Sequence, residues 1–385
     1  MSAEACSKAK KANALMLLSN AFTHDPRVYN EAESLVGAGY SVTVLAWDKK
    51  AEAPAEETKE GIKVIRMRNN WLMRLLPYDF MRMHVWWRIA YKKAKELNIK
   101  EKFDFIHCHD LDTLPIGVRL KEKFDVPLIY DAHEIWGYMV SRYLPKILAD
   151  HYLRLEKRLA KYPDSILTVN EPLKEYLAKI TDRPIHIIMN CKPLQGNTYE
   201  PTKNKKLVLL YLGTLTPSRF LLELVDAVKE ITDVDCIIGG SGHANYTEAL
   251  KAKCKGQPNV KFVGRIPFND VIPMTKKADV VVCMADPAAL NNSRGLTNKQ
   301  FEAMVCGRPV ICTKGTYPGD FTEGEGVGLV AEYNKGALKT AIIRLRDNQQ
   351  LRESIGRNAL RRAIEEYNWE RQEKVLVDLY EKIKR

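Results

Sequence analysis

A polar helix start, followed one turn later by a carboxylate, is the part of this chain whose residues most directly suggest chemistry. Thr297 is a favourable N-cap residue, so the free backbone N–H groups after it, with Lys299 beside them, would face an anion such as a phosphate. Glu302 lies among apolar residues one turn further on, where a carboxylate is costly unless a partner such as a sugar diol hydrogen-bonds to it. The segment predicts a phosphate-and-ribose site, although an ordinary helix, turn and strand with a surface lysine fits the same residues.

The elements that must position these groups alternate between short apolar strands and helices. In the first half we predict strands at residues 15–18, 42–46, 105–107, 127–130 and 165–169, with helices at 28–36, 114–123 and 144–161. In the second half we predict strands at 207–212, 236–238, 260–263 and 280–284, with helices at 221–231 and 246–254. Continuous apolar strands separated by helices indicate parallel sheets covered on both faces. The sequence therefore predicts an α/β protein with two doubly wound sheets.

A polar segment divides the two halves. Residues 192–206 contain four lysines, Gly196 and Pro201, which is typical of an interdomain linker. We predict a first domain at 1–195 and a second at 205–366. A last helix at about 369–385 is amphipathic and needs an apolar surface to cover, which a return to the first domain would supply.

Composition limits the class of protein. The net charge of +12 favours an acidic partner, either nucleic acid, an anionic membrane or a phosphorylated substrate. Eight cysteines are scattered without a C-x-x-C pair, as expected for reduced core thiols of a cytoplasmic protein. Residues 1–12 are polar and precede an apolar run too short for a signal peptide, and no run approaches the roughly 18 apolar residues of a spanning helix. We therefore expect a cytoplasmic protein whose contact with a membrane is peripheral.

A basic, aromatic region is the candidate for that contact. Residues 70–102 contain eight basic and three acidic side chains, interleaved with tryptophan and tyrosine. Such a helix is typical of a protein that docks on the anionic cytoplasmic face of a membrane. The membrane residues we predict are Trp71, Arg82, Trp86, Trp87 and Arg88. A second basic helix at 154–161 would extend the surface, whereas packing of the same aromatic residues in a core is the alternative. Nucleic-acid binding explains the charge less well, because no recognition motif accompanies it.

Motifs along nearly the whole chain share one family resemblance. They lie at residues 211–219, 238–243, 260–265 and 297–311 in the second half, and at 25–31, 107–110 and 130–134 in the first. Together they resemble glycosyltransferase family 4, also called glycosyl transferases group 1. The resemblance implies the GT-B fold, with two Rossmann-like domains whose parallel sheets face an interdomain cleft. It also implies retaining hexosyl transfer from a UDP- or GDP-linked sugar, with neither a metal nor a cofactor.

The resemblance assigns residues of the second half to the donor. Gly213 lets the backbone approach the diphosphate, and Arg219 stands where the family usually has a lysine. Thr214 occupies the position of an expected arginine, so Lys299 is the candidate replacement. The donor-binding residues implied are Gly213, Arg219, Gly240, Gly242, Arg265, Ile266, Arg294, Thr297, Asn298, Lys299 and Glu302. The glycine cluster and the residues around Arg265 equally fit plain turns at strand ends.

One position departs from the family pattern. The family has two glutamates eight positions apart, the first of which grips the donor sugar; with Glu302 as the second, the first position holds Arg294. Neutral hydrogen bonds from residues 291–293 could compensate, and Arg294 could meet a diphosphate or an acidic sugar. A degenerate, inactive site is the alternative.

In the first half, His133 follows a strand and falls where the family has a histidine close to the reacting sugar, although it could instead cap a helix near Ile135. The catalytic residues implied are His133, Arg219 and Lys299. The acceptor-binding residues implied are Asp25, Arg27 and His109, with a plain salt bridge from Arg27 to Glu31 as the alternative. His107, His109 and Asp110 could suggest a metal, but no further spacing completes a site, so we interpret them as pocket wall or core.

The sequence thus predicts a peripheral membrane glycosyltransferase that moves a hexosyl group from a nucleotide sugar to a lipid-linked or glycan-precursor acceptor. A nucleotide-sugar epimerase with the same donor domain is one alternative. A non-catalytic membrane-associated partner with a degenerate donor site is the other.

Overall fold

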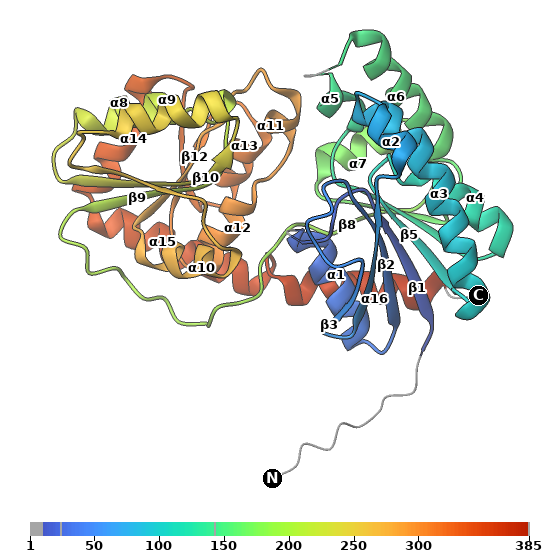
Figure 1. Ribbon diagram of the computed structural model, residues 1–385. Coiled ribbons are helices and arrows are strands. Elements are labelled where there is room, and N and C mark those ends of the chain that lie inside the picture. The colour runs from blue at the N-terminus through green and yellow to red at the C-terminus, as the bar shows by residue number, and fades with distance from the viewer. Residues whose placement is uncertain (1–10, 24, 142–143, 384–385) are drawn as a thin grey trace. The chain divides into compact units, whose positions relative to one another are not determined.

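The computed structural model describes residues 11–23, 25–141 and 144–383, which form two α/β units (Figure 1). Contacts within each unit define its bounds. The first unit comprises the chain up to Ile188 together with the segment that begins at Glu373, and the second unit comprises Met189–Gln372. Residues 1–10, which include Cys6, lie outside the described residues, and the expectations for them remain predictions.

The first unit has an eight-stranded sheet in the order β3-β4-β2-β1-β5-β6-β7-β8, parallel except for the β3–β4 pair. Its strands are β1 Asn13–Leu18, β2 Ser41–Asp48, β3 Glu56–Lys59, β4 Ile62–Arg68, β5 Phe105–His109, β6 Leu128–Ala132, β7 Ser165–Thr168 and β8 Ile185–Ile187. Its helices are α1 Pro26–Gly37, α2 Trp71–Leu75, α3 Asp79–Lys100, α4 Leu114–Phe124, α5 Trp136–Val140, α6 Lys146–Leu159 and α7 Glu171–Ala178.

The second unit has a six-stranded, fully parallel sheet in the order β11-β10-β9-β12-β13-β14. Its strands are β9 Leu207–Leu215, β10 Val234–Gly242, β11 Val260–Gly264, β12 Val280–Cys283, β13 Val310–Thr313 and β14 Gly328–Ala331. Its α-helices are α8 Leu221–Lys229, α9 Ala244–Cys254, α10 Phe268–Lys277, α11 Leu290–Arg294, α12 Asn298–Val305, α13 Tyr317–Gly324, α14 Lys335–Asp347 and α15 Gln349–Glu365. The predicted pair of parallel α/β sheets is confirmed.

Central strands are apolar on both faces because helices cover both sides of each sheet (Figure 1). Every residue of β5, β6 and β12 is buried. Because these strands are buried, their sequences are largely continuous apolar runs. Any polar residue within such a strand lies in the interior of the protein. His107, His109 and Asp131 are the residues for which this matters.

The last helix, α16 Trp369–Ile383, contacts the first unit through the part that follows Glu373. The Tyr380 ring lies 5.4 Å from that of Tyr40 and 4.8 Å from that of Phe105. Its hydroxyl is 2.9 Å from Nδ1 of His107. The C-terminal helix therefore reaches the polar interior of the first unit.

The seven described cysteines are all buried, in agreement with the predicted core positions. Across the described part of the chain, no helix combines the length and the apolar character needed to cross a membrane.

Candidate active site

Helix α12 begins at the predicted residue. Its N-cap is Thr297, whose backbone N–H donates to Oε1 of Gln300 at 3.0 Å, and the Gln300 side chain is in turn held by Pro318 O at 3.0 Å. Gly307, with φ of 64°, follows the helix in the left-handed conformation expected at C′. Hydrogen bonds within its first turn and to α13 therefore hold the start of α12 in place. Its free backbone N–H groups are thereby preorganised to bind an anion.

The ammonium group of Lys299 lies beside the end of β9. Nζ is 4.7 Å from the centre of the Tyr211 ring, and a β-carbon on Gly213 would lie only 3.1 Å from it. Burial, followed by repulsion from Arg219, lowers the pKa of Lys299 to about 8. A cation held with so little solvation is stabilised by an arriving anion. The structure therefore brings Lys299, Gly213 and Arg219 together, as the donor assignment requires.

Glu302 is buried on the same helix and has a partner that the sequence did not suggest. Lys192, only 6% exposed, places Nζ 3.8 Å from Oε1 of Glu302 and 3.2 Å from Oδ1 of Asn298. Burial lowers the pKa of Lys192. A cavity of about 760 Å³ adjoins this pair, with Phe268 also in its lining. Lys192 was missed because it is one of four lysines in a polar segment, and nothing local distinguishes the buried one.

The glycine cluster continues strand β10 instead of forming a turn. Gly240 pairs with Gly213 and Gly242 with Leu215 in parallel register. A β-carbon on Gly240 would lie 1.7 Å from Gly213 O, and one on Gly242 would lie 1.9 Å from Leu215 O. These two glycines are required by the close approach of β9 and β10, and the plain-turn interpretation is wrong for them.

The other predicted donor residues lie at neighbouring loops and helix ends of the second unit. Arg265 is exposed directly after β11, and Ile266 next to it is half-buried. Arg294 is the last residue of the one-turn helix α11 and is half-buried shortly before α12.

In the first unit, Arg27 is engaged by protein partners. Its guanidinium donates to both carboxylate oxygens of Asp131, at 2.9 and 2.6 Å, and to Ile188 O at 2.6 Å. It also lies 3.1 Å from Oε1 of Glu31. Arg27 is 7% exposed and forms the salt bridge to Glu31 that the sequence left as the alternative, while acceptor binding by Arg27 stays a prediction.

His133 is held between two carboxylates. Nε2 lies 2.7 Å from Oδ2 of Asp131, and Nδ1 lies 3.3 Å from Oδ2 of Asp110. Burial alone would lower the pKa of His133, but Asp110 and Asp131 together raise it well above its usual value. The two carboxylates therefore favour the protonated ring, which is suited to donating hydrogen bonds and unsuited to acting as a base. Helix α5 has Ile135 as its N-cap without a side-chain cap, so the helix-capping alternative is wrong.

The two other residues that the resemblance assigned to acceptor binding, His109 and Asp25, belong to elements of the fold. His109 is 1% exposed within the sheet, so the core interpretation holds and a direct contact with an acceptor is wrong. Asp25 is the N-cap of α1 and accepts a hydrogen bond from Val28 N at 3.2 Å. Asp110 was interpreted from the sequence as pocket wall or core, and Asp131 was assigned no role; an aspartate near the end of an otherwise apolar strand was the available signal for Asp131.

The predicted membrane surface needs correction at Trp86. This side chain is fully buried and stacks on Trp47 with ring centres 5.2 Å apart, so it cannot reach a membrane. Trp87 is half-buried and donates to Asp112 O at 2.5 Å, and Arg82 is half-buried with its Nε bound to backbone carbonyls of the α2 turn. Trp71 remains 73% exposed and Arg88 is also exposed.

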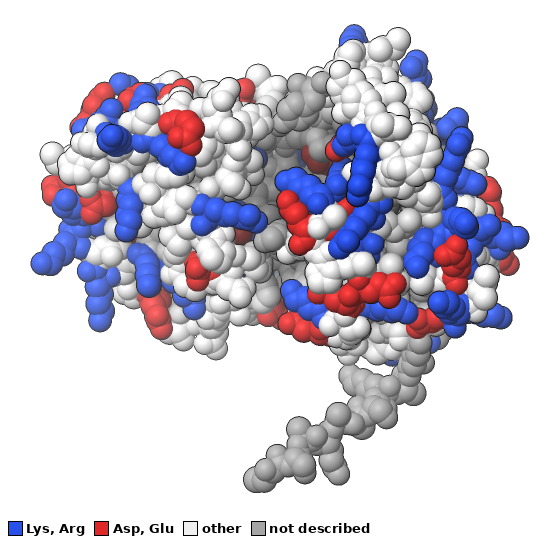
Figure 2. Space-filling model, in the orientation of Figure 1, with Lys and Arg blue, Asp and Glu red and all other residues white. Residues whose placement is uncertain are grey.

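A different apolar surface accompanies Trp71 on α2 and the turn that follows. Leu75 is 72% exposed and Tyr78 is 60% exposed. In Figure 2 basic and acidic side chains are interspersed over the visible face of both units, so net charge alone does not mark a binding surface.

Two α/β units on largely parallel sheets, the second with cationic groups beside the end of β9, have the arrangement of the GT-B fold. Two family models match the chain, Glycosyltransferase Family 4 over residues 27–192 and Glycosyl transferases group 1 over residues 206–348. The chain belongs to this glycosyltransferase family.

Individual relatives agree with this class. An uncharacterised glycosyltransferase of Methanocaldococcus jannaschii is 25% identical over 377 residues, which cover 91% of each chain. A GDP-mannose-dependent monoacylated alpha-(1-6)-phosphatidylinositol monomannoside mannosyltransferase of Corynebacterium glutamicum is 30% identical over 165 residues, 40% of this chain and 42% of that one.

Solved structures share the fold at low identity. Sucrose-phosphate synthase of Thermosynechococcus elongatus has a TM-score of 0.78 at 19% identity, covering 96% of this chain and 98% of its own. Anabaena HepE in complex with UDP and glucose has a TM-score of 0.71 at 16% identity, covering 96% of this chain and 100% of its own.

Proposed function

We propose that this glycosyltransferase moves a hexosyl group from a UDP- or GDP-linked sugar to a lipid-linked or glycan-precursor acceptor at a membrane surface, with retention of the anomeric configuration. The observation that carries the donor assignment is the burial of Lys299 beside Gly213 and Arg219 at the start of α12. Names of similar proteins support it, since one relative is GDP-mannose-dependent and one structural neighbour was solved with UDP.

The leaving diphosphate is the group that these residues would stabilise. As the bond from the anomeric carbon to the phosphate oxygen breaks, negative charge grows on that oxygen, and preorganised donors in a dry site stabilise it. We assign this role to Lys299, Arg219 and the N-terminus of α12. With two cations supplied by the chain, no divalent metal is needed on the diphosphate, and no organic cofactor takes part.

The ribose and sugar have their own candidate ligands. Glu302, now paired with Lys192, would accept hydrogen bonds from the ribose hydroxyls, and the adjoining cavity offers room for the nucleobase. Arg294, in place of the sugar-gripping glutamate, favours a diphosphate or an acidic sugar as its partner. The family resemblance puts His133 close to the reacting sugar, where one of its ring N–H groups would have to exchange Asp110 or Asp131 for a sugar hydroxyl. The acceptor hydroxyl attacks from the face that the diphosphate leaves.

The membrane part of the proposal now depends on α2. Trp71, Leu75 and Tyr78 are large apolar side chains exposed within eight residues, which suits insertion at the interface of a bilayer. A basic hollow on α6, lined by Arg154, Lys157, Arg158 and Lys161, would meet anionic headgroups. The lipid named for the mannosyltransferase relative makes a lipid-linked acceptor a consistent choice.

A transfer assay tests the proposal. The full chain is incubated with a panel of labelled UDP- and GDP-sugars and with vesicles of phosphatidylinositol or isoprenoid-phosphate lipids, without added metal, and label in the lipid phase is counted. We expect one donor to label lipid and Lys299→Gln to abolish the signal, with Lys255→Gln, an exposed lysine on the same unit, as the matched control.

Two rival functions give different results in the same experiment. An epimerase would convert the sugar nucleotide in the absence of any acceptor. A non-catalytic partner would leave every donor intact and bind none of them in a calorimeter. Either result would replace the proposal.

A further inference from the structure

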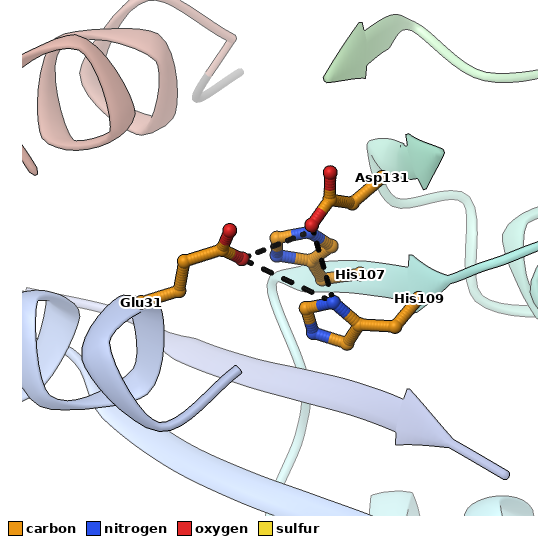
Figure 3. A group of neighbouring side chains, drawn as sticks. All are labelled: Glu31, His107, His109 and Asp131. Carbon is orange, nitrogen blue, oxygen red and sulfur yellow. Dashed lines mark ion pairs between the residues drawn. The ribbon is translucent and has the colours of Figure 1, made fainter. Parts of the chain in front are cut away.

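Four metal-binding side chains meet in the interior of the first unit (Figure 3). Glu31 comes from α1, His107 and His109 from β5, and Asp131 from β6. One ligand atom of each lies within 4.8 Å of all the others, and every one of the four is buried. Asp131 also pairs with His133 at 2.7 Å, whereas Glu31, His107 and His109 have no role in the transfer proposed above.

The distances between the ligand atoms match a tetrahedral ion better than a hydrogen-bond network. Nδ1 of His109 is 3.3 Å from Oδ2 of Asp131, whereas Oε2 of Glu31 is 3.8 Å from Nε2 of His107 and 4.0 Å from Nδ1 of His109. Zinc bonds of about 2.0–2.2 Å place tetrahedral ligands roughly 3.3–3.6 Å apart. Two of the three distances exceed hydrogen-bond length and need only small side-chain shifts to reach that value.

Polar atoms in the cluster are left without partners, which is costly in a protein interior. Among the described residues, no hydrogen bond reaches either carboxylate oxygen of Glu31, Nε2 of His107, or either ring nitrogen of His109. Native structures satisfy nearly all such atoms, and each exception calls for an explanation such as a bound ion. Oε2 of Glu31 lies 3.8 Å from Nε2 of His107 and 4.0 Å from Nδ1 of His109, so these three atoms point to a shared occupant.

The groups around the cluster suit a metal. Tyr380 lies 2.9 Å from Nδ1 of His107, so a proton on that nitrogen leaves the lone pair of Nε2 free to face Glu31. Arg27 contacts the other oxygen of Glu31, Oε1, and so leaves Oε2 to the histidines.

We propose that Glu31, His107, His109 and Asp131 form a buried zinc site that ties α1, β5 and β6 together. Two imidazoles and two carboxylates are a nitrogen and oxygen set that zinc accepts, whereas magnesium requires octahedral oxygen ligands and keeps its waters. Four protein ligands leave no open position, so the ion is structural. It is distinct from any metal on the donor diphosphate, and it holds whether or not the proposed transfer is correct.

Metal content measures the site directly. The full chain is purified without a metal-affinity step, and its zinc is counted by mass spectrometry. The apo protein, made with a chelator, is then melted with and without ZnCl₂. We expect about one zinc per chain and a rise of at least about 5 °C in the unfolding temperature of the apo protein when zinc is in large excess over its dissociation constant.

Variants locate the ion. Glu31→Gln and His109→Gln should lose the bound zinc and the thermal shift. Glu33→Gln, exposed on the same helix, and His151→Gln, exposed on α6, should keep both. If a cluster variant does not fold, Co²⁺ added to the wild-type apo protein should still give the intense visible bands of tetrahedral nitrogen and oxygen ligation.

A folded wild-type chain that retains no zinc and whose melting ZnCl₂ does not change would overturn the proposal, and a shared proton or a water would then occupy the cluster. Equal zinc binding by wild type and Glu31→Gln, or cobalt bands with thiolate charge-transfer intensity, would overturn it as well, because the ion would then lie elsewhere.

Discussion

Donor binding should weaken as pH rises through the pKa of Lys299. In the free protein this pKa is about 8, because burial and Arg219 disfavour the charged form. A bound diphosphate would favour the charged form and return the pKa at least to the ordinary lysine value of about 10.4. Only protonated Lys299 contributes its charge, so affinity is full below pH 8 and falls above it.

The size of the effect follows from the two pKa values. At pH 9 about one free chain in eleven carries a protonated Lys299, whereas nearly every donor-bound chain does. The dissociation constant should therefore be about tenfold weaker at pH 9 than at pH 7, equivalent to about 1.4 kcal/mol. The assay is a calorimetric titration of the protein with the sugar nucleotide that serves as donor in the transfer assay. The charges on its diphosphate do not change between pH 7 and pH 9.

Two controls isolate the lysine. Lys299→Gln should bind weakly at both pH values without the tenfold change, and Lys255→Gln should behave as wild type. An affinity independent of pH between 7 and 9 would refute the reasoning, and so would a pH dependence that persists in Lys299→Gln.

Four other predictions concern different parts of the chain. Gly240→Ala should lower the free energy of unfolding by at least about 2 kcal/mol in calorimetry, because its β-carbon would overlap Gly213 O; unchanged stability would contradict this. Trp86→Ala should cost about 3–5 kcal/mol in denaturant unfolding, and a small loss would mean that it does not fill the core. Trp71→Ala should leave stability within about 0.5 kcal/mol but reduce flotation with anionic vesicles, so intact flotation argues against the α2 surface. His133→Gln should slow turnover about 10–100-fold at constant donor affinity, and a wild-type rate would remove it from the reaction.

The strands and the donor helix were predictable because local patterns determine them. A strand covered on both faces is mostly apolar, and this made β5, β9 and β12 visible in the sequence. The N-cap at Thr297 and the C′ glycine at 307 likewise act within one turn. By contrast β3 is short, exposed and polar, so no apolar run marks it.

The errors concern residues whose role depends on tertiary contacts. Trp86 looked exposed because basic residues surround it in sequence, yet on α3 it projects from the buried face towards Trp47. The pairing of Arg27 with Asp131 was missed, because Asp131 lies more than a hundred residues away in the sequence. Lys192 became recognisable only from its distance to Glu302. Buried polar partners distant in sequence leave no periodic signal, and for that reason the interior network of the first unit was not predicted.

The most direct test of the central claim is to follow the anomeric proton by NMR while the full chain acts on its donor and lipid acceptor. The account predicts that the donor signal is replaced by that of an acceptor-linked sugar of the same anomeric configuration, and that Lys299→Gln prevents this. An inverted product, an epimerised sugar nucleotide, or an unchanged donor in the presence of folded wild-type protein and every acceptor tried would contradict it.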